Sequence, residues 1–239
     1  MAQIKANEAL VKALQTWNID HLYGIPGDSV DAVVDSLRTV RDQFKFYHVR
    51  HEEVASLAAA SYTKMTGKIG VALSIGGPGI VHLLNGMYDA KMDNVPQLII
   101  AGQTNSTLLG TKFFQETNIS KMVDDVAVYH HQIQKGDNVF EITNEAIRTA
   151  YEKNGVAVII CPNDLLTQKI KDTTNRAVDT TKPKPASPKF KSIKKAAKLI
   201  DKAKKPVMLI GLGTQHAKDE LREFIEAAKI PVIHTRSEE

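Results

Sequence analysis

Hydrophobic and polar positions alternate along residues 1–165 in two rhythms, one spaced as in amphipathic helices and one as in strands. The helical spacing predicts helices at 6–16, 29–38, 53–66, 79–92 and 140–153. Extended runs predict strands at 20–25, 45–49, 69–74, 97–101, 127–133 and 156–161, with an irregular stretch from 102 to 126. The runs IGVALS, QLIIA and VAVIIC are almost wholly apolar, which is typical of parallel strands buried on both faces. The pattern therefore predicts a doubly wound parallel α/β sheet.

The predicted helix 53–66 is built largely from small residues, and its larger side chains recur at i, i+3, i+4 and i+7. That spacing places on one face Val54, Leu57, Ala58, Ser61, Tyr62 and Met65. We expect Gly67 to end this helix in the left-handed conformation that glycine adopts without strain.

A change of composition divides the chain. Residues 1–170 form the first predicted domain, and residues 171–190 are rich in Thr, Pro and Lys without periodicity, as in an interdomain linker. Residues 191–239 begin a second αβ domain. Its predicted elements are helix 191–204, strand 206–210, helix 216–229 and strand 230–234. Two strands and two helices cannot close a sheet around a core, so we expect this second domain to be incomplete.

The composition is that of a soluble globular protein, with 43% hydrophobic and 24% charged residues. The single cysteine excludes a disulfide framework and favours a reducing compartment. No signal-peptide core and no membrane-spanning run is present. Much of the net charge of +4 lies in the lysine-rich residues 182–206, where aromatic interleaving is limited to Phe190. For this segment a solvated linker and helix face is a better interpretation than a nucleic-acid-binding surface.

Four loops follow predicted strands and therefore share the carboxyl edge of the sheet, where open α/β folds bind ligands. They are Pro26-Gly27-Asp28-Ser29, Arg50-His51-Glu52-Glu53, Gly76-Gly77-Pro78-Gly79 and Gly102-Gln103-Thr104-Asn105. Glycine lets the backbone approach a ligand closely, and proline suits a first helical turn. Two glycine-proline loops beside an acidic loop thus predict a cofactor cleft.

Each of these features also has a purely structural explanation. Glu52 and Glu53 could simply stabilise the positive end of a helix dipole. The segment Gly76–Gly79 could be a turn with an N-cap, and His82 could be a packed or capping histidine. Known phosphate loops fit poorly, because GGPGIVH lacks the Lys-Ser/Thr ending of a P-loop and His216 replaces the third glycine of a dinucleotide fingerprint in GLGTQH.

Longer motifs point to a known family. In order along the chain they are LYGIPGDSVDAVVDSL, RHEEVASLAAASYTKMTGKIGV, GGPGIVHLLNGMYDAKMDNVPQLIIAGQ and FFQETN. They resemble the N-terminal pyrimidine-binding domain of thiamine-diphosphate enzymes, most of all bacterial pyruvate oxidases of the quinone-linked, acetate-forming type. The resemblance extends to about residue 234, so the chain looks like an N-terminal fragment of such an enzyme.

The resemblance implies a catalytic role for Glu52. In this family the matching acid shares a proton with N1′ of the cofactor's aminopyrimidine, which then removes the C2 proton of the thiazolium. Such a carboxyl group sits in a largely apolar cleft, so we expect desolvation to hold its pKa up. Glu53 is then a helix-end charge.

The same comparison assigns the remaining site residues. Phe114 and Gln115 match residues that face the substrate, with Phe114 as plain core the alternative. Cofactor contacts are implied, besides Glu52, for Pro26, Gly27, Ser29, Ile75, Gly76, Pro78, Gly79, His82 and Asn85. Ile75 departs from the Ser or Thr common at its position and offers no side-chain hydrogen bond there. Gly211 and Gly213 would lie near FAD in the central domain, although a structural turn would look the same.

For the whole enzyme, the resemblance implies oxidative decarboxylation of pyruvate, with FAD passing electrons to quinone or oxygen. The diphosphate and its Mg²⁺ would bind a C-terminal domain absent here, so no metal site is assigned and we expect the 239-residue chain alone to be inactive. The parent would be a homotetramer built as a dimer of dimers, cytoplasmic and peripheral to the inner face of the cell membrane. An acetolactate synthase-like carboligase and a non-catalytic truncated subunit remain alternatives.

Overall fold

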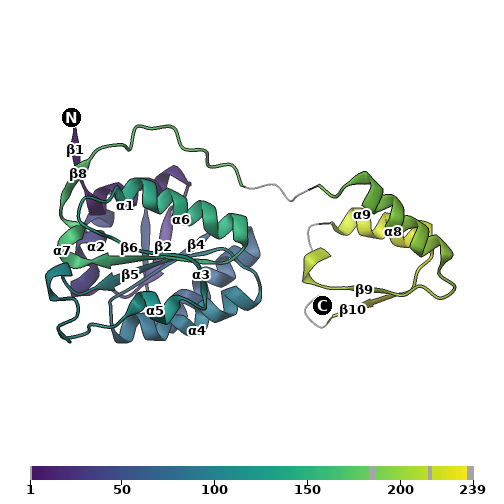
Figure 1. The fold of residues 1–239 in the computed structure, drawn as a ribbon, viewed down its shortest axis with the longest axis horizontal. Helices are drawn as coiled ribbons and strands as arrows, with labels where there is room; N and C mark the ends of the chain where they lie inside the picture. Colours follow the sequence, from purple (N-terminus) through teal and green to yellow (C-terminus); the bar gives the residue numbers. More distant parts are fainter. Residues whose placement is uncertain (1, 183–186, 215–216, 236–239) are drawn as a thin grey trace. The chain divides into compact units, whose positions relative to one another are not determined.

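The computed structural model describes residues 2–182, 187–214 and 217–235. The chain divides into two compact units, Met1–Pro183 and Lys184–Glu239 (Figure 1). The first unit contains a six-stranded sheet with parallel neighbours in the order β3-β2-β4-β5-β7-β6. Its strands are β2 (His21–Gly24), β3 (Lys45–His48), β4 (Gly70–Ser74), β5 (Gln97–Gln103), β6 (Ala127–Gln132) and β7 (Val156–Pro162). The predicted doubly wound α/β sheet is confirmed.

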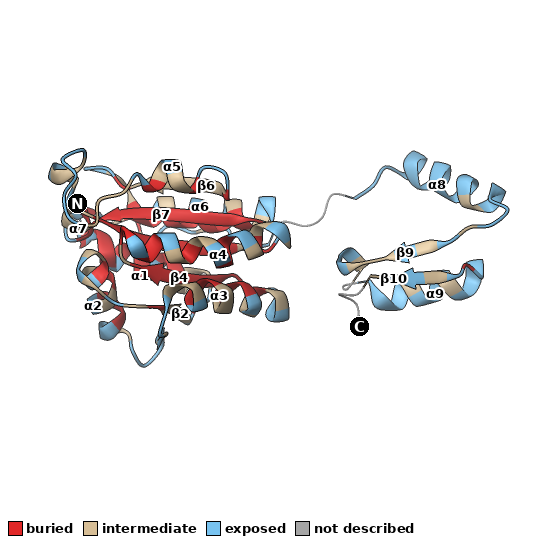
Figure 2. Ribbon diagram, turned by 90° about the horizontal axis from the view of Figure 1, so that it is seen from below, coloured by how far each residue is buried: buried red, intermediate tan, exposed pale blue. Residues whose placement is uncertain are grey.

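Helices cover both faces of this sheet (Figure 1). One face carries α1 (Ala6–Thr16), α2 (Asp31–Thr39) and α6 (Val139–Lys153), and the other α3 (Glu52–Thr66), α4 (Pro78–Met92) and α5 (Ile119–Val123). The central strands are buried along their length (Figure 2). In β5, Leu98 and Ile100 join the apolar cluster under α1 and α6, whereas Ile99 and Ala101 join the cluster under α3 and α4. Alternating side chains thus build two cores from one continuous apolar run.

The single cysteine lies inside this sheet. Cys161, on β7, is fully buried, and desolvation raises the pKa of its thiol to about 12. A thiol of this kind is a packing group, because nucleophilic attack and metal binding require the thiolate.

Several short elements were not expected from the sequence. The stretch predicted as irregular contains the 3-10 turn η2 (Ser106–Leu108) and helix α5, whose first turn is capped by Asn118 accepting from Lys121 N–H at 3.0 Å. A further 3-10 turn, η1 (Asp28–Val30), precedes α2, and α7 (Asn163–Leu166) follows β7. Strand β1 (Gln3–Lys5) pairs antiparallel with β8 (Lys169–Lys171). These pieces have three to five residues, too few for a periodic pattern to show.

The orientation of α3 differs from the face indicated by its larger side chains. Its buried side chains are instead Ala55, Ser56, Ala59, Ala60 and Thr63. Val54 and Met65 are 49% and 85% exposed. The reason is close helix packing, since a Cβ on Gly86 of α4 would lie 2.6 Å from the Leu57 backbone nitrogen. Only small residues fit at such a contact. Gly67 ends the helix with φ 67°, as predicted.

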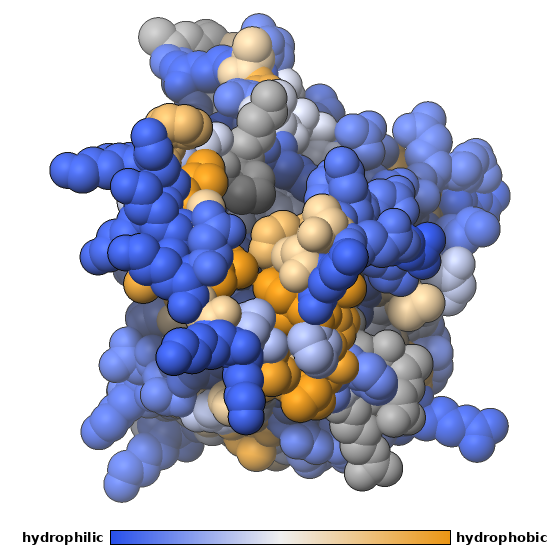
Figure 3. All heavy atoms as spheres, turned by 90° about the vertical axis from the view of Figure 1, so that its right-hand side faces the viewer, coloured by the Kyte–Doolittle hydropathy of each residue, from blue (hydrophilic) through white to orange (hydrophobic). Residues whose placement is uncertain are grey.

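The second unit contains α8 (Phe190–Lys202), β9 (Met208–Ile210), η3 (Leu212–Thr214), α9 (Lys218–Ala228) and β10 (Val232–His234). β9 and β10 pair in parallel. Large apolar side chains such as Phe190 and Leu209 are exposed, and apolar surface shows among hydrophilic side chains in Figure 3. Residues 183–186 of the predicted linker, and His216 at the start of the predicted helix 216–229, lie outside the described residues. None of the described helices is both long and apolar enough to cross a membrane.

Candidate active site

The loops that leave β2, β3, β4 and β5 lie along the carboxyl edge of the sheet, because all four strands run parallel. A hydrogen bond joins two of these loops, in which Gly76 N–H donates to Ser29 Oγ at 3.1 Å. Beside it, a Cβ on Gly102 at the end of β5 would lie 2.3 Å from the same oxygen. Ser29 therefore sits where the loops after β2, β4 and β5 converge.

The glycines of these loops are required by contacts within the protein. A Cβ on Gly27 would lie 2.6 Å from Ile75 Cγ2, and one on Gly79 would lie 2.8 Å from Ile75 Cγ1. A Cβ on Gly76 would meet the Gly102 carbonyl oxygen at 2.8 Å. Ile75 thus packs against both glycine loops. Serine at this position would lose both contacts because it has no γ carbon, and threonine would keep only Cγ2. Close packing of loops, rather than space kept open for a ligand, explains these glycines.

A third segment closes over the start of α4. Gly77 has φ 61°, and a Cβ there would lie 2.9 Å from the Gln115 carbonyl oxygen. Gln115 itself has φ 61°, a conformation that non-glycine residues adopt rarely and mostly at sites held by their surroundings. The segment is held by Glu116, whose carboxylate accepts from the backbone N–H groups of Gly110 and Phe113. These hydrogen bonds, that of Gly110 first, lower the pKa of Glu116.

These segments enclose a cavity of about 380 Å³ at the carboxyl edge. Its lining residues are Asp28, Ser29, Ile75, Gly76, Gln103, Thr104, Asn105, Leu108, Phe113, Phe114, Gln115 and Asn163. The wall combines apolar groups with amide and hydroxyl side chains and the carboxylate of Asp28, a mixture typical of small-molecule sites. Five predicted residues meet here, namely Ser29, Ile75, Gly76, Phe114 and Gln115. Phe114 is 78% exposed, so its assignment as plain core is wrong.

A carboxylate–imidazole pair lies at the start of α3 and on α4. Glu52 Oε2 and His82 Nδ1 are 2.9 Å apart, and the side chains are 12% and 41% exposed. Glu52 is the first residue of α3, and His82 is in the second turn of α4, which begins at Pro78. Glu52 therefore points toward α4 and away from bulk water.

The pKa of Glu52 departs from the expectation made from the sequence. Desolvation by burial raises it, but the hydrogen bond from His82, the backbone N–H of Glu52 and the charges of His82 and His51 together lower it below the ordinary value. The expectation that burial alone holds this pKa up is wrong, because the cleft contains a hydrogen-bond donor that the apolar pattern did not reveal.

The second acid of the loop has other partners. Glu53 is 38% exposed and accepts a hydrogen bond from Asn85 Nδ2. Its backbone N–H donates to His51 Nδ1 at 3.3 Å, so that His51 caps α3. These contacts agree with a helix-end role for Glu53 and tie Asn85 to the helix terminus.

His51 also brings a third ligand-type group to the Glu52–His82 pair. Its ring lies 4.4 Å from that of His82, and the candidate ligand atoms of His51, Glu52 and His82 lie within 4.8 Å of one another. The hydrogen bond between Glu52 and His82 engages one carboxylate oxygen and one ring nitrogen of this group. A mostly buried carboxylate that can exchange a proton suits a ring nitrogen, so these residues fit an aminopyrimidine.

The other predicted site residues are not gathered with these groups. Pro26, on its loop, and Pro78, the first residue of α4, are exposed. In the second unit, a Cβ on Gly211 would meet only Thr235, at 3.6 Å, and one on Gly213 would meet nothing within 4 Å. No contact within the described residues requires glycine at position 213.

Sequence reasoning missed part of the cavity wall. Asn163 follows β7 at the carboxyl edge, and the rule that selected the other loops would have selected it. Thr104 and Asn105 lie in one of the four loops that the sequence places at this edge, but no motif marks them individually as site residues. His51 was likewise in a named loop, and only the fold shows its ring against His82.

Two family models match parts of this chain. The family model described as "Thiamine pyrophosphate enzyme, N-terminal TPP binding domain" matches residues 4–122. A second one, "Thiamine pyrophosphate enzyme, central domain", matches residues 193–238. The first match contains Glu52 and every residue of the cavity wall except Asn163.

Curated relatives align with nearly the whole chain. Thiamine pyrophosphate-containing protein YdaP of Bacillus subtilis (strain 168) is 46% identical over 98% of this chain and 41% of its own length. A pyruvate oxidase of Lactiplantibacillus plantarum is 38% identical over 97% of this chain and 39% of its own. An acetolactate synthase of Mycobacterium leprae is 33% identical, over 98% and 38%. The chain thus spans about two fifths of the length of these relatives.

Proposed function

The chain belongs to the thiamine pyrophosphate-dependent enzyme family, and from that premise we propose that it supplies the pyrimidine side of an enzyme that oxidatively decarboxylates pyruvate. The observation that carries the proposal is the Glu52–His82 pair at the carboxyl edge of the sheet. Electrons would leave through FAD to quinone or oxygen, with Gly211 and Gly213 on the flavin side. Mg²⁺ would bind with the diphosphate, for which this chain offers no assigned ligand.

Thiamine diphosphate, when bound, supplies a carbon nucleophile for attack on a 2-keto acid. Glu52 would hold and exchange the proton at the aminopyrimidine nitrogen N1′. His82 would orient the Glu52 carboxylate through the 2.9 Å hydrogen bond and keep it ionised in the absence of the ring. Ile75 would exclude water beside the pyrimidine, because it fills the space between two glycine loops.

The neighbouring cavity would receive the substrate side of the reaction. Phe114 is exposed and Gln115 is held in its strained conformation by Gly77 and Glu116, so both are available to a small keto acid. The Thr104 hydroxyl and the Asn105 amide would offer hydrogen bonds to a carboxylate or a carbonyl, whereas the Gln103 amide is already engaged by the Thr117 carbonyl and the Thr104 N–H.

An acetolactate synthase-like carboligase is the second candidate, favoured by the 33% identity to the Mycobacterium leprae protein. The resemblance associates His82 with oxidases and asparagine at this position with acetolactate synthases. The higher identity to a pyruvate oxidase supports the same choice.

Product analysis tests the proposal. We expect a full-length enzyme that contains this chain, supplied with pyruvate, thiamine diphosphate, Mg²⁺, FAD and a quinone analogue, to release acetate, or acetyl phosphate when inorganic phosphate is added, and to reduce the flavin. Accumulation of acetolactate without acceptor reduction would support the carboligase instead. Pyruvate labelled with ¹³C would show whether a second pyruvate has been incorporated into the product, as acetolactate formation requires.

A further inference from the structure

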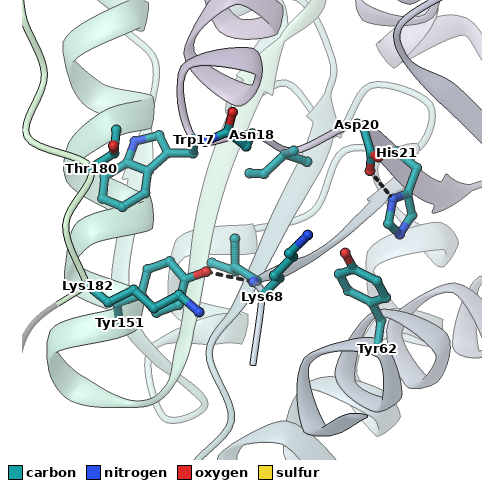
Figure 4. A pocket seen from close by; sticks show the side chains of 11 residues that line it. Trp17, Asn18, Asp20, His21, Tyr62, Lys68, Tyr151, Thr180 and Lys182 are labelled. Carbon is teal, nitrogen blue, oxygen red and sulfur yellow. Dashed lines mark hydrogen bonds and ion pairs between the residues drawn. The ribbon is translucent and has the colours of Figure 1, made fainter. Parts of the chain in front are cut away.

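A second cavity, of about 190 Å³, lies at the amino edge of the sheet, opposite the candidate active site (Figure 4). It opens where β2 and β4 begin, among the ends of α1, α3 and α6 and the segment after β8. Its lining residues are Trp17, Asn18, Ile19, Asp20, His21, Tyr62, Lys68, Ile69, Tyr151, Thr180 and Lys182. The function proposed above uses none of these residues.

Aromatic rings form two walls of this cavity. Trp17 and Tyr151 stack with ring centroids 5.9 Å apart, and Tyr62 lies on the other side against His21 at 4.5 Å (Figure 4). Both rings of the first wall are fixed by polar contacts. Trp17 Nε1 donates to Asn144 Oδ1 at 2.8 Å, and Tyr151 Oη accepts from Ile69 N–H at 2.7 Å. The walls are therefore preorganised, which lowers the entropic cost of binding a ring between them.

The charged groups of this cavity differ in whether they have a partner among the described residues. Asp20 pairs with His21 at 2.6 Å, and Lys182 Nζ donates to the Gly67 carbonyl and lies 5.4 Å from the centre of the Tyr151 ring. Lys68 takes part in none of the ion pairs found among the described residues. Figure 4 shows Lys68 between the Trp17–Tyr151 wall and Tyr62. Two ammonium groups against one carboxylate leave the cavity positive.

We propose that this cavity is a binding site for a small aromatic carboxylate, with its ring against Trp17 and Tyr151 and its carboxylate on Lys68. The size fits one ring, since a cavity of about 150 Å³ suffices for benzene. The stacked walls favour a planar ligand over an aliphatic one. Lys68 favours an anion, because its ammonium gains a charge-assisted hydrogen bond without giving up an existing ion pair.

Benzoate is a suitable probe, and the protein contains its own reporter. Trp17 is the only tryptophan of the chain, so its fluorescence reports on this cavity alone. Titration of the 239-residue chain with benzoate should change the emission in a saturable way, with a dissociation constant of about 1 mM or tighter. Benzamide, which keeps the ring and loses the charge, should bind at least about tenfold more weakly, and so should acetate, which keeps the charge and loses the ring.

The variant Lys68→Met should weaken benzoate binding by about tenfold or more, because the ring contacts remain and the ion pair is lost. Lys121→Met is the matched control, since it removes one exposed lysine on α5 and should leave binding unchanged. The variant Lys68→Gln tests the same loss of charge independently. The rise in melting temperature caused by benzoate gives a second measure of binding.

Absence of a saturable response overturns the proposal, as does equal binding by Lys68→Met and the parent chain. Equal affinity for acetate and benzoate overturns the aromatic part. The fluorescence titration requires no catalytic turnover, so its outcome does not depend on the proposed enzyme activity.

Discussion

The two edges of the same parallel sheet are built in different ways. At the carboxyl edge, backbone packs on backbone or on one apolar side chain, as at Gly76 against the Gly102 carbonyl and Gly27 against Ile75. At the amino edge, long side chains from three helices stack and hydrogen-bond, as Trp17 and Tyr151 do. The glycine loops at the first edge are therefore positioned by backbone packing, beside the Glu52–His82 side-chain contact, and the second edge is positioned by side-chain contacts alone.

This difference predicts how each edge responds to substitution. A change at the carboxyl edge must either remove a reacting group or move backbone, so its effects should be large. A change at the amino edge removes one contact among several and should cost less. The following predictions test that contrast, from the largest expected effect to the smallest.

Glu52→Gln should give the largest effect. In a full-length version of the enzyme, loss of the exchangeable proton at N1′ is expected to slow hydrogen–deuterium exchange at C2 of bound thiamine diphosphate by about 10²–10⁴-fold. The measurement is quenched-flow exchange followed by NMR. Glu53→Gln is the matched control and should leave the rate within a few-fold, because Glu53 contacts Asn85 and the helix terminus. Exchange in Glu52→Gln at the parent rate would remove Glu52 from this role.

Gly77→Ala should destabilise the first unit by about 3 kcal/mol, since φ 61° is strained for alanine and its Cβ would overlap the Gln115 carbonyl. Urea unfolding measures the change in the free energy of unfolding. Gly213→Ala is the control, because a Cβ there meets nothing within 4 Å. Equal stability of the two variants would contradict the idea that backbone contacts build the carboxyl edge.

Tyr151→Phe tests the amino edge. It leaves the buried Ile69 N–H without its 2.7 Å acceptor, which should cost about 1–2 kcal/mol of unfolding free energy. Tyr62→Phe removes a hydroxyl for which no hydrogen bond is found among the described residues, and should change stability by less than about 0.5 kcal/mol. Thiamine C2 exchange should be unaffected in both. A loss larger than that of Gly77→Ala would reverse the proposed order of the two edges.

His82→Asn should have the smallest effect on stability and a clear effect on titration. The pKa of Glu52 is lowered in the folded protein, so the stability from this interaction is complete above the ordinary pKa of glutamate. This contribution to stability is lost as the pH falls through the pKa that Glu52 has in the folded protein. Replacing His82 removes the hydrogen bond that counteracts desolvation, so the pKa of Glu52 should rise. ¹³C NMR would detect this change. An unchanged titration would show that His82 does not set this pKa.

Much of the fold follows from the sequence because it depends on periodicity. The long strands and helices lie within two or three residues of their predicted bounds, and Gly67 ends α3 as expected. The buried face of α3 could not be predicted in this way. Its small residues are buried because α3 and α4 touch through Gly86, a distance that no pattern within one helix encodes.

The candidate site was predictable to the extent that topology decides it. Loops after parallel strands must share an edge, which places Ser29, Gly76 and Glu52 there. The partnership of Glu52 with His82, thirty positions away, requires the fold itself. The same holds for Gln115, whose positive φ depends on Gly77 and on the hydrogen bonds of Glu116.

The burial of Cys161 has a practical consequence for spectroscopy. The only thiol of the chain is sealed inside β7 and stays protonated at neutral pH. A cysteine introduced on the surface would therefore be the sole site modified by maleimide reagents under native conditions. Spin labels or fluorophores could then be attached to either edge of the sheet in turn, on an otherwise unaltered background.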